Sequence, residues 1–257
     1  MIAREHLPEK IRVSVGSAMT LGLIHGKLDA LPTTIYLLTY HAGKCSANCG
    51  FCPQARESKS RADMLSRVTW PTFPTRQVLQ KMRAITEKGL IKRICIQALN
   101  YPTVFDDVLN LVKEIRSIVN LPFSVSCQPF GEGKMRKLDQ MGVDRIGIPL
   151  DAATKDVFDR IKGPLADGPY TWAKQREALR KAVKIFGKGK VSTHLIVGLG
   201  ESEEGMVKMI QWCVDNAVYP GLFSFTPIQG TALESNPQPS LDHYRRIQVA
   251  HYLITNG

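Results

Sequence analysis

The sequence lacks the features that mark membrane-spanning, secreted and nucleic-acid-binding proteins. No stretch approaches the ~20 uninterrupted apolar residues that a membrane span needs. Residues 1–15 mix charge with isolated apolar side chains and lack the apolar block of a signal peptide. A zinc-finger, RNP-type or helix-turn-helix signature is missing, as are a Ser/His/Asp triad and a Walker lysine. We therefore expect a cytoplasmic protein with no membrane and no nucleic-acid partner.

Acidic residues are also scarce. The chain has 23 Asp and Glu against 34 Lys and Arg, which gives a net charge of +11. Such a surface attracts nucleic acid, an anionic membrane or an acidic protein, but a solvated, lysine-rich surface has the same composition. The basic run from Arg56 to Arg61 allows the same two interpretations, a contact for an acidic partner or a solvated loop. Charge alone does not choose between them.

Cysteine is sparse and unevenly placed, with six among 257 residues. In a reducing compartment, clustered thiols more often bind metals or act in catalysis than form disulfides. Three of the six fall in the short segment from Cys45 to Cys52, and Cys95, Cys127 and Cys213 are dispersed. The clustered three are therefore candidates for a metal site.

What the sequence does contain is a regular alternation of short β-rich runs with longer helical runs. Expected strands lie at 34–40, 91–99, 123–127, 143–150, 191–197 and 221–226. Expected helices lie at 75–89, 104–119, 133–141, 154–161, 171–186, 203–214 and 241–254, and 55–74 is expected to be a long loop. Apolar strands that alternate with helices indicate right-handed βαβ units around a parallel sheet.

Six such units after a strand-borne loop predict an α/β fold, a partial (β/α) barrel of the TIM type with its chemistry at the C-terminal strand ends. Residues 1–257 are expected to form one domain, in which 1–33 are an N-terminal extension and 34–257 are the barrel. The pattern leads to another strand after Gly257, so a truncated C-terminus is also one of our expectations.

The cysteine segment has the spacing C-x3-C-x2-C, formed by Cys45, Cys49 and Cys52 directly after the first expected strand. Thiolates are the usual ligands of iron–sulfur clusters, and three of them can bind three irons of a [4Fe–4S] cubane. The fourth iron then stays open to the amino and carboxylate groups of S-adenosylmethionine (SAM). The alternative is a zinc site of the Cys3His type with His41 as its fourth ligand.

This motif resembles that of the radical SAM superfamily, and the likeness extends over nearly the whole chain. More closely, the chain resembles the biotin synthase and lipoyl synthase branch, through the segments Val191–Glu201 (VSTHLIVGLGE), Leu150–Ala152 (LDA) and Pro227–Leu233 (PIQGTAL). The resemblance implies that the cluster cleaves SAM to a 5′-deoxyadenosyl radical. It also implies four residues that contact SAM: Phe51, Ile196 and Gly198 at the adenine, and Asp151.

The dispersed cysteines suggest a second, sulfur-donating iron–sulfur cluster. In biotin synthase such a cluster is held inside the barrel, and Cys95 and Cys127 match two of its ligand positions, whereas Ser192 stands at the third. Buried cysteines also serve as small apolar core residues. Both interpretations of Cys95 and Cys127 stay open at this point, and Cys213 is expected in the core.

The resemblance implies hydrogen abstraction from an unactivated aliphatic C–H bond followed by sulfur insertion, the reaction of a sulfurtransferase. Without the full ligand set of biotin synthase, the chain looks closer to one subunit of a two-component, archaeal-type lipoyl synthase acting on octanoyl-lysine. Its expected partners are a ferredoxin- or flavodoxin-type electron donor, an acyl-carrying lipoyl-domain protein and a second synthase subunit. The alternatives are sulfur insertion into dethiobiotin and, in another class, a non-catalytic zinc-binding module.

Overall fold

The computed structural model describes residues 7–257, and its centre is one curved sheet of eight strands in the order β10-β9-β8-β7-β6-β2-β1-β5. Six neighbouring strands are parallel. They are β2 (Thr34–Thr39), β6 (Arg93–Gln97), β7 (Phe123–Ser126), β8 (Arg145–Gly147), β9 (Val191–Val197) and β10 (Tyr219–Ser224). The expected α/β partial barrel is confirmed, and among the described residues the two edge strands, β10 and β5, do not pair to close it.

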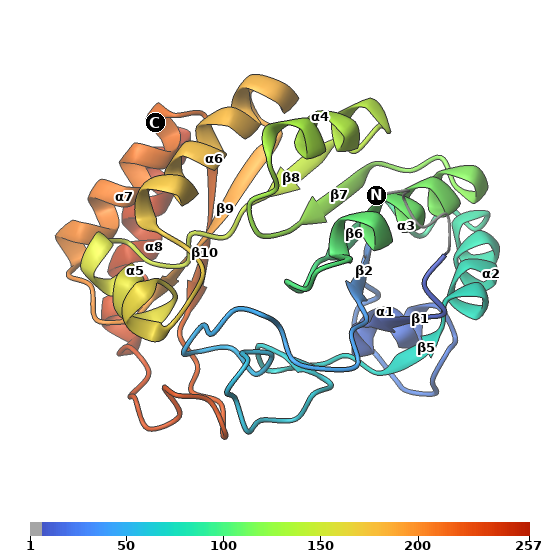
Figure 1. The fold of residues 1–257 in the computed structure, drawn as a ribbon, viewed down its shortest axis with the longest axis horizontal. Helices are drawn as coiled ribbons and strands as arrows, with labels where there is room; N and C mark the ends of the chain where they lie inside the picture. The colour runs from blue at the N-terminus through green and yellow to red at the C-terminus, as the bar shows by residue number, and fades with distance from the viewer. Residues whose placement is uncertain (1–6) are drawn as a thin grey trace.

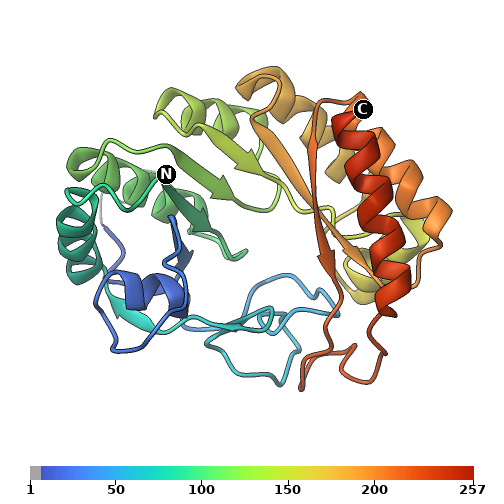
Figure 2. The same cartoon turned by 180° about the vertical axis from the view of Figure 1, so that it is seen from behind.

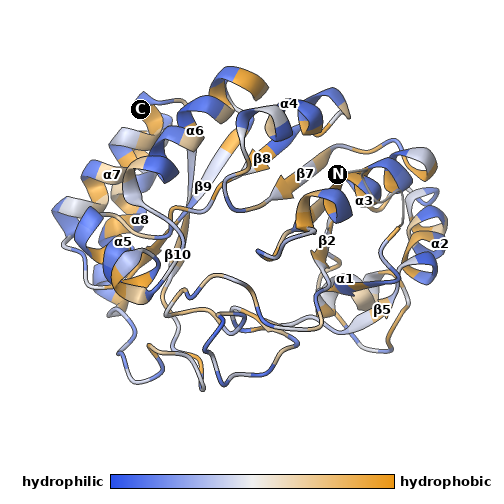
Figure 3. Cartoon of the chain, viewed as in Figure 1, coloured by the Kyte–Doolittle hydropathy of each residue, from blue (hydrophilic) through white to orange (hydrophobic). Residues whose placement is uncertain are grey.

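Helices cover the outer, convex side of the sheet (Figures 1 and 2). They are α2 (Thr75–Thr86), α3 (Val104–Ile118), α4 (Glu132–Gln140), α5 (Lys155–Ile161), α6 (Trp172–Phe186), α7 (Glu203–Asp215) and α8 (Leu241–Asn256). Helices α2, α3, α4, α6 and α7 bury mainly apolar residues along one side, and Figure 3 shows apolar and polar residues interspersed along them. Helix α8 instead leaves Val249, Tyr252 and Leu253 exposed. No helix within residues 7–257 has the length and apolar character needed to cross a membrane.

The segment expected as an N-terminal extension contributes to the sheet. Strand β1 (Lys10–Val13) pairs antiparallel with both β2 and β5 (Thr72–Pro74), and helix α1 (Val15–Thr20) follows it. Residues 1–6 of that segment lie outside the described part of the chain. The expected loop at 55–74 likewise contains β5 and the small hairpin of β3 (Met64–Leu65) and β4 (Val68–Thr69). These short strands carry too few residues to show a two-residue period in the sequence.

Side-chain alternation gives the parallel strands an inner and an outer face. Along β9 the residues are alternately buried and half-buried from Val191 to Val197. Ser192, His194 and Ile196 therefore face the inside of the barrel, and the residues between them pack against helices. A Cβ on Gly147 would lie 3.3 Å from the Ser192 hydroxyl and 3.4 Å from that of Ser126, which places all three on the inner face.

Candidate functional site

The loop after β2 carries the three clustered cysteines across the C-terminal ends of the strands. Backbone bonds hold its shape: the N–H of Cys45 donates to the Gln54 carbonyl at 2.9 Å, and that of Cys52 to the Cys49 carbonyl at 2.9 Å. The loop is also bonded to α5, because the Gly50 N–H donates to the Ile161 carbonyl at 2.7 Å. The C-x3-C-x2-C segment is thus held both by hydrogen bonds within its own loop and by a hydrogen bond to α5.

The thiols form a small buried cluster of their own. Cys45 and Cys49 are 9% and 7% exposed, and the half-buried Phe51, Cys52 and Tyr170 pack against them. Phe51, predicted to contact SAM, therefore lies beside the cysteines. Tyr170 comes from the segment that leads into α6 and accepts a hydrogen bond at 2.8 Å from the Asn100 side chain. Neither residue of this Asn100–Tyr170 pair was singled out from the sequence.

A buried side-chain scaffold supports the loop from the side of β1. Gln54 is 1% exposed, and its amide donates to the carbonyls of Ala62 at 2.7 Å and Met64 at 2.5 Å. Arg12 of β1, 4% exposed, donates to Oε1 of the Gln54 side chain at 3.2 Å. Burial lowers the pKa of Arg12 from its ordinary value. Because Arg12 and Gln54 are far apart in the chain, their link had no signal in the sequence.

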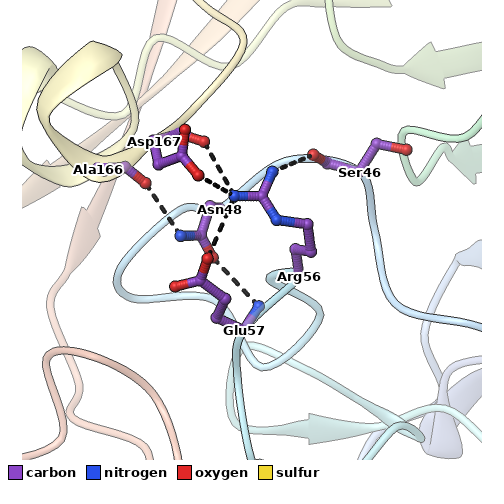
Figure 4. Close-up of polar contacts among 6 residues, drawn as sticks. All are labelled: Ser46, Asn48, Arg56, Glu57, Ala166 and Asp167. Atoms are coloured by element: carbon purple, nitrogen blue, oxygen red, sulfur yellow. Dashed lines mark hydrogen bonds and ion pairs between the residues drawn. The ribbon is translucent and has the colours of Figure 1, made fainter.

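The opposite side of the loop is tied to the short 3₁₀ helix η1 (Pro164–Ala166) that follows α5 (Figure 4). The Asn48 side chain donates to the Ala166 carbonyl at 3.0 Å and accepts from the Glu57 N–H at 3.2 Å. Arg56 forms ion pairs with Asp167 and Glu57. The basic run that starts at Arg56 is therefore largely engaged in bonds within this chain.

Burial above all, and repulsion from neighbouring negative groups after it, disfavour the thiolate forms of Cys49 and Cys52 when no metal is bound. Desolvation, followed by the neighbouring thiols and Asp151, raises the pKa of Cys49, and desolvation raises that of Cys52 to about 12. A metal ligand must be deprotonated, so binding at these thiols releases protons. Backbone donors already point at one sulfur: the N–H groups of Asn100 and Ala47 lie 3.2 Å and 3.5 Å from the Cys45 Sγ.

This donor set fits a [4Fe–4S] cluster and does not fit a single zinc ion. Within residues 7–257 no three His, Cys, Asp or Glu side chains lie close enough together to hold one metal ion. The thiols are nevertheless near enough to shift one another's pKa. A four-iron cubane is larger than one ion and spaces its ligands further apart. His41, the fourth ligand of the zinc alternative, stacks on Tyr101 at 4.8 Å and 5°.

Asp151 lies four residues beyond the end of β8, in a left-handed conformation with φ of +68°. Its N–H donates to the His194 carbonyl at 2.8 Å, and its carbonyl accepts from the Ile196 N–H at 2.9 Å, so β9 fixes this backbone. The side chain is 7% exposed and pairs at 2.6 Å with the fully buried Lys162. Asp151 therefore lies beyond the C-terminal end of its strand, where the expected SAM site lies, and its contact with SAM stays a prediction. The sequence did not reveal its ion pair with Lys162.

Ile196 and Gly198 lie at the C-terminal end of β9. Ile196 is half-buried on the inner face. Gly198 has φ of +100°, and a Cβ there would lie 2.7 Å from Pro239, so this position requires glycine. The Glu201 carboxylate accepts from the N–H groups of Gly198 at 2.7 Å and Leu199 at 3.0 Å, which gives this turn its shape. Their contact with the adenine stays a prediction.

The dispersed cysteines are not brought together. Cys95 pairs with Ser124 in the register of β6 and β7, and both lie on the inner face. Cys127, one residue beyond β7, is 1% exposed and belongs to the apolar core, where only burial raises its pKa. Cys213 of α7 is fully buried, as expected. A second cluster held by Cys95 and Cys127 stays a prediction that the register does not favour.

A cavity of about 320 Å³ opens beside the cysteine loop, between α3 and α4. Its lining is mainly aromatic and aliphatic, with one cation: Ser46, Asn100, Tyr101, Pro102, Val104, Phe105, Phe130 and Lys134. The Lys134 ammonium lies 4.8 Å from the centre of the Phe105 ring. The cavity reaches the thiol site through Asn100, whose N–H contacts the Cys45 Sγ. No pattern in the sequence pointed to it.

Comparison with known proteins shows which family this chain resembles in sequence. The model of the radical SAM superfamily matches residues 39–213. Biotin synthase from Aquifex aeolicus (strain VF5) is 26% identical over 86% of this chain and 63% of its own length. Biotin synthase from Desulforudis audaxviator (strain MP104C) is 23% identical over 85% of this chain and 64% of its own. The chain thus spans less than two thirds of the length of these relatives.

Solved structures agree on the fold. Methylornithine synthase superposes with a TM-score of 0.64 at 14% identity, over 84% of this chain and 62% of that protein. The FeFe-hydrogenase maturase HydG from Carboxydothermus hydrogenoformans superposes with a TM-score of 0.62 at 18% identity, over 93% of this chain and 55% of that protein. The family model that matches residues 39–213 establishes the family, and the three-thiol loop and the shared fold agree with it. The chain belongs to the radical SAM superfamily, whose members carry a [4Fe–4S] cluster and SAM.

Proposed function

We propose that this protein is an enzyme that uses a [4Fe–4S] cluster on Cys45, Cys49 and Cys52 to cleave SAM and abstract hydrogen from an unactivated aliphatic C–H bond. The observation that carries this proposal is the anchored three-thiol loop at the C-terminal ends of six parallel strands. A bound cluster would supply the one electron that breaks the S–C5′ bond of SAM, with methionine and a 5′-deoxyadenosyl radical as the products. A radical of this kind needs a site from which water and stray donors are excluded.

The residues of this chain divide the remaining tasks. The cysteines would hold three irons as thiolates, and the N–H groups of Ala47 and Asn100 are placed to bond to the Cys45 sulfur. Phe51 and Tyr170 cover the thiols with apolar surface. Asp151, Ile196 and the Gly198 turn present a carboxylate, an apolar side chain and a tight backbone at neighbouring strand ends, where SAM is expected to lie.

For the substrate we favour octanoyl-lysine on a carrier protein, with sulfur insertion as the outcome. The supporting observation is the placement of the dispersed cysteines: Cys95 is on the inner face, Cys127 is in the core, and Ser192 stands at the third position. A chain without a complete second ligand set needs sulfur from elsewhere, which suits one subunit of a two-component lipoyl synthase. The acyl-carrying protein, the second subunit and a small electron-donor protein would be its partners.

Sulfur insertion into dethiobiotin is the second candidate. It is favoured by the curated relatives, which are biotin synthases with 23–26% identity over 83–86% of this chain. The inner face also carries Cys95 and His194, two side chains of the kinds that ligate iron–sulfur clusters.

The decisive experiment is anaerobic incubation of the cluster-loaded protein with SAM, a reductant and either an octanoyl-lysyl peptide or dethiobiotin, followed by mass spectrometry. We expect 5′-deoxyadenosine in both, and sulfur in the peptide when the second subunit is supplied. Sulfur in dethiobiotin alone would replace the first substrate by the second. Absence of 5′-deoxyadenosine from protein with a full cluster would refute the central proposal.

A further inference from the structure

Lys162 is a buried cation next to the cluster loop, and none of the roles assigned above uses it. It caps α5 at its C-terminal end and is 0% exposed. A lysine is almost never fully buried unless its charge is paired. Its ammonium group donates to the Asp151 carboxylate at 2.6 Å and to the Pro149 carbonyl at 2.5 Å. Two of its three N–H groups are therefore used at the end of β8.

The Lys162 ammonium group also faces an aromatic ring of the thiol site. Its Nζ lies 5.4 Å from the centre of the Tyr170 ring, and Tyr170 packs against Cys45 and Cys49. The helix that ends at Lys162 is itself bonded to the cysteine loop through the Ile161 carbonyl and the Gly50 N–H. One backbone bond and one aromatic ring thus fix the cation relative to the thiols.

Two contacts place the cation beside Cys49. Lys162 directly follows Ile161, whose carbonyl accepts from the residue after Cys49, and the Tyr170 ring that faces its ammonium group packs against Cys49. A cation favours negative charge on its neighbours, and in a site shielded from water this attraction is much stronger than in bulk solvent. The cation is therefore placed to stabilise an electron-rich group on Cys49.

We propose that Lys162, held in place by Asp151, is a positioning residue that raises the reduction potential of the [4Fe–4S] cluster. The inference rests on the cluster assignment of the proposed function and does not depend on the substrate. Reduction adds one electron, and so one negative charge, to the cluster, and net charge in the surroundings is one of the factors that set its potential. A fixed cation nearby favours the reduced form, and the partner carboxylate opposes it.

The test is a redox titration of the cluster-loaded protein without SAM, with the reduced cluster followed by electron paramagnetic resonance. Lys162→Gln removes the charge, and we expect its midpoint potential to fall. A tenfold lower ratio of reduced to oxidised cluster at a fixed potential corresponds to about 59 mV for one electron. Lys162→Arg keeps the charge and should keep the potential, whereas Asp151→Asn should raise it.

Opposite shifts in Lys162→Gln and Asp151→Asn are the signature of charge, because simple loss of structure would move both potentials in the same direction. Lys208→Gln, at an exposed pair on α7, is the matched control and should match the wild type. An unchanged potential in Lys162→Gln, or equal shifts in the Gln and Arg variants, would overturn the inference. Should Lys162→Gln not retain its cluster, Asp151→Asn decides: an upward shift supports the proposal and any other result contradicts it.

The same preparations separate this inference from the proposed function. Wild-type protein that holds its cluster but forms no 5′-deoxyadenosine with SAM and reductant contradicts the proposed function, while the potentials can still be compared. Normal 5′-deoxyadenosine formation with an unaltered potential in Lys162→Gln contradicts the role of Lys162 alone.

Discussion

The two groups of cysteines in this chain are placed by different physical rules. Cys45, Cys49 and Cys52 share one loop, so their closeness follows from a few residues of chain and from backbone bonds within it. Cys95 lies in the middle of β6 and Cys127 just beyond the neighbouring strand β7, so their closeness depends on the register and on which face each side chain takes. The distances between ligands in one loop therefore depend little on the rest of the fold, whereas the distances between ligands on different strands depend on it strongly.

The comparison is tested most severely by replacing one cysteine of the loop. Cys49→Ser should lose the brown iron–sulfur absorbance and reduce 5′-deoxyadenosine formation to background, because three thiolates are needed for three irons. Cys213→Ala, at a fully buried core position in α7, is the control and should keep both signals. Iron content, absorbance and product would be measured anaerobically. A Cys49→Ser protein with full iron and activity would show that the loop does not hold the cluster.

The next largest expected effect is a loss of stability from a substitution at Gly198, directly after β9. Gly198→Ala places a Cβ at 2.7 Å from Pro239 on a backbone with φ of +100°. Strain of this kind costs about 1–3 kcal/mol, and crowding adds ~1–3 kcal/mol, so the melting temperature should fall by several degrees.

Gly187→Ala separates strain from crowding. Gly187 has φ of +93°, and nothing lies within 4 Å of its would-be Cβ. This variant should therefore lose only the strain contribution, and its melting temperature, measured under the same conditions, should fall less than that of Gly198→Ala. Equal losses in the two alanine variants would mean that Pro239 yields to the new methyl group, and that the strand end is less rigid than its contacts imply.

The dispersed cysteines give a smaller effect that separates a core role from ligation. Cys127→Ala should lower the free energy of unfolding by about 1–2 kcal/mol through the cavity it leaves, with no loss of iron. Cys95→Ala, on the inner face, should also keep its iron. Iron and sulfide per chain would be measured after identical reconstitution. A parallel loss of iron in both variants would restore the second cluster as a property of this chain.

Much of this arrangement could be predicted from the sequence because it depends on local patterns. The alternation of strands and helices predicted the six parallel strands, and the spacing of Cys45, Cys49 and Cys52 predicted the location of the candidate site. Strand β1 was missed because the four residues of Lys10–Val13 carry almost no periodic signal. The sequence left open the side on which Cys127 lies, because a shift of one residue moves a side chain to the other face.

Buried polar contacts between distant segments were the least predictable part. Lys162 stands at the end of a helix in the sequence, where a lysine is usually solvated and favoured by the helix dipole. Its burial follows only from the way α5, β8 and the Tyr170 segment meet. The link from Arg12 to Gln54 is of the same kind, since both partners are polar residues with no shared motif.

The smallest expected effect concerns the tether of the cysteine loop to η1. Arg56 is 41% exposed and Asp167 is 84% exposed, and ion pairs of this kind contribute at most about 1 kcal/mol. Arg56→Ala should therefore lower global stability very little. It should raise the hydrogen exchange of the loop, because it removes a contact between two segments far apart in the chain.

Arg61→Ala is the matched control for this tether, since Arg61 pairs with Asp63 inside the same loop. Asn48→Ala, which removes the hydrogen bonds to Ala166 and Glu57, should increase exchange more than Arg56→Ala. Hydrogen exchange followed by mass spectrometry measures all three variants on the same peptides. If the Arg61 variant exchanges as fast as the Asn48 variant, bonds within the loop maintain its shape and its tether to η1 does not.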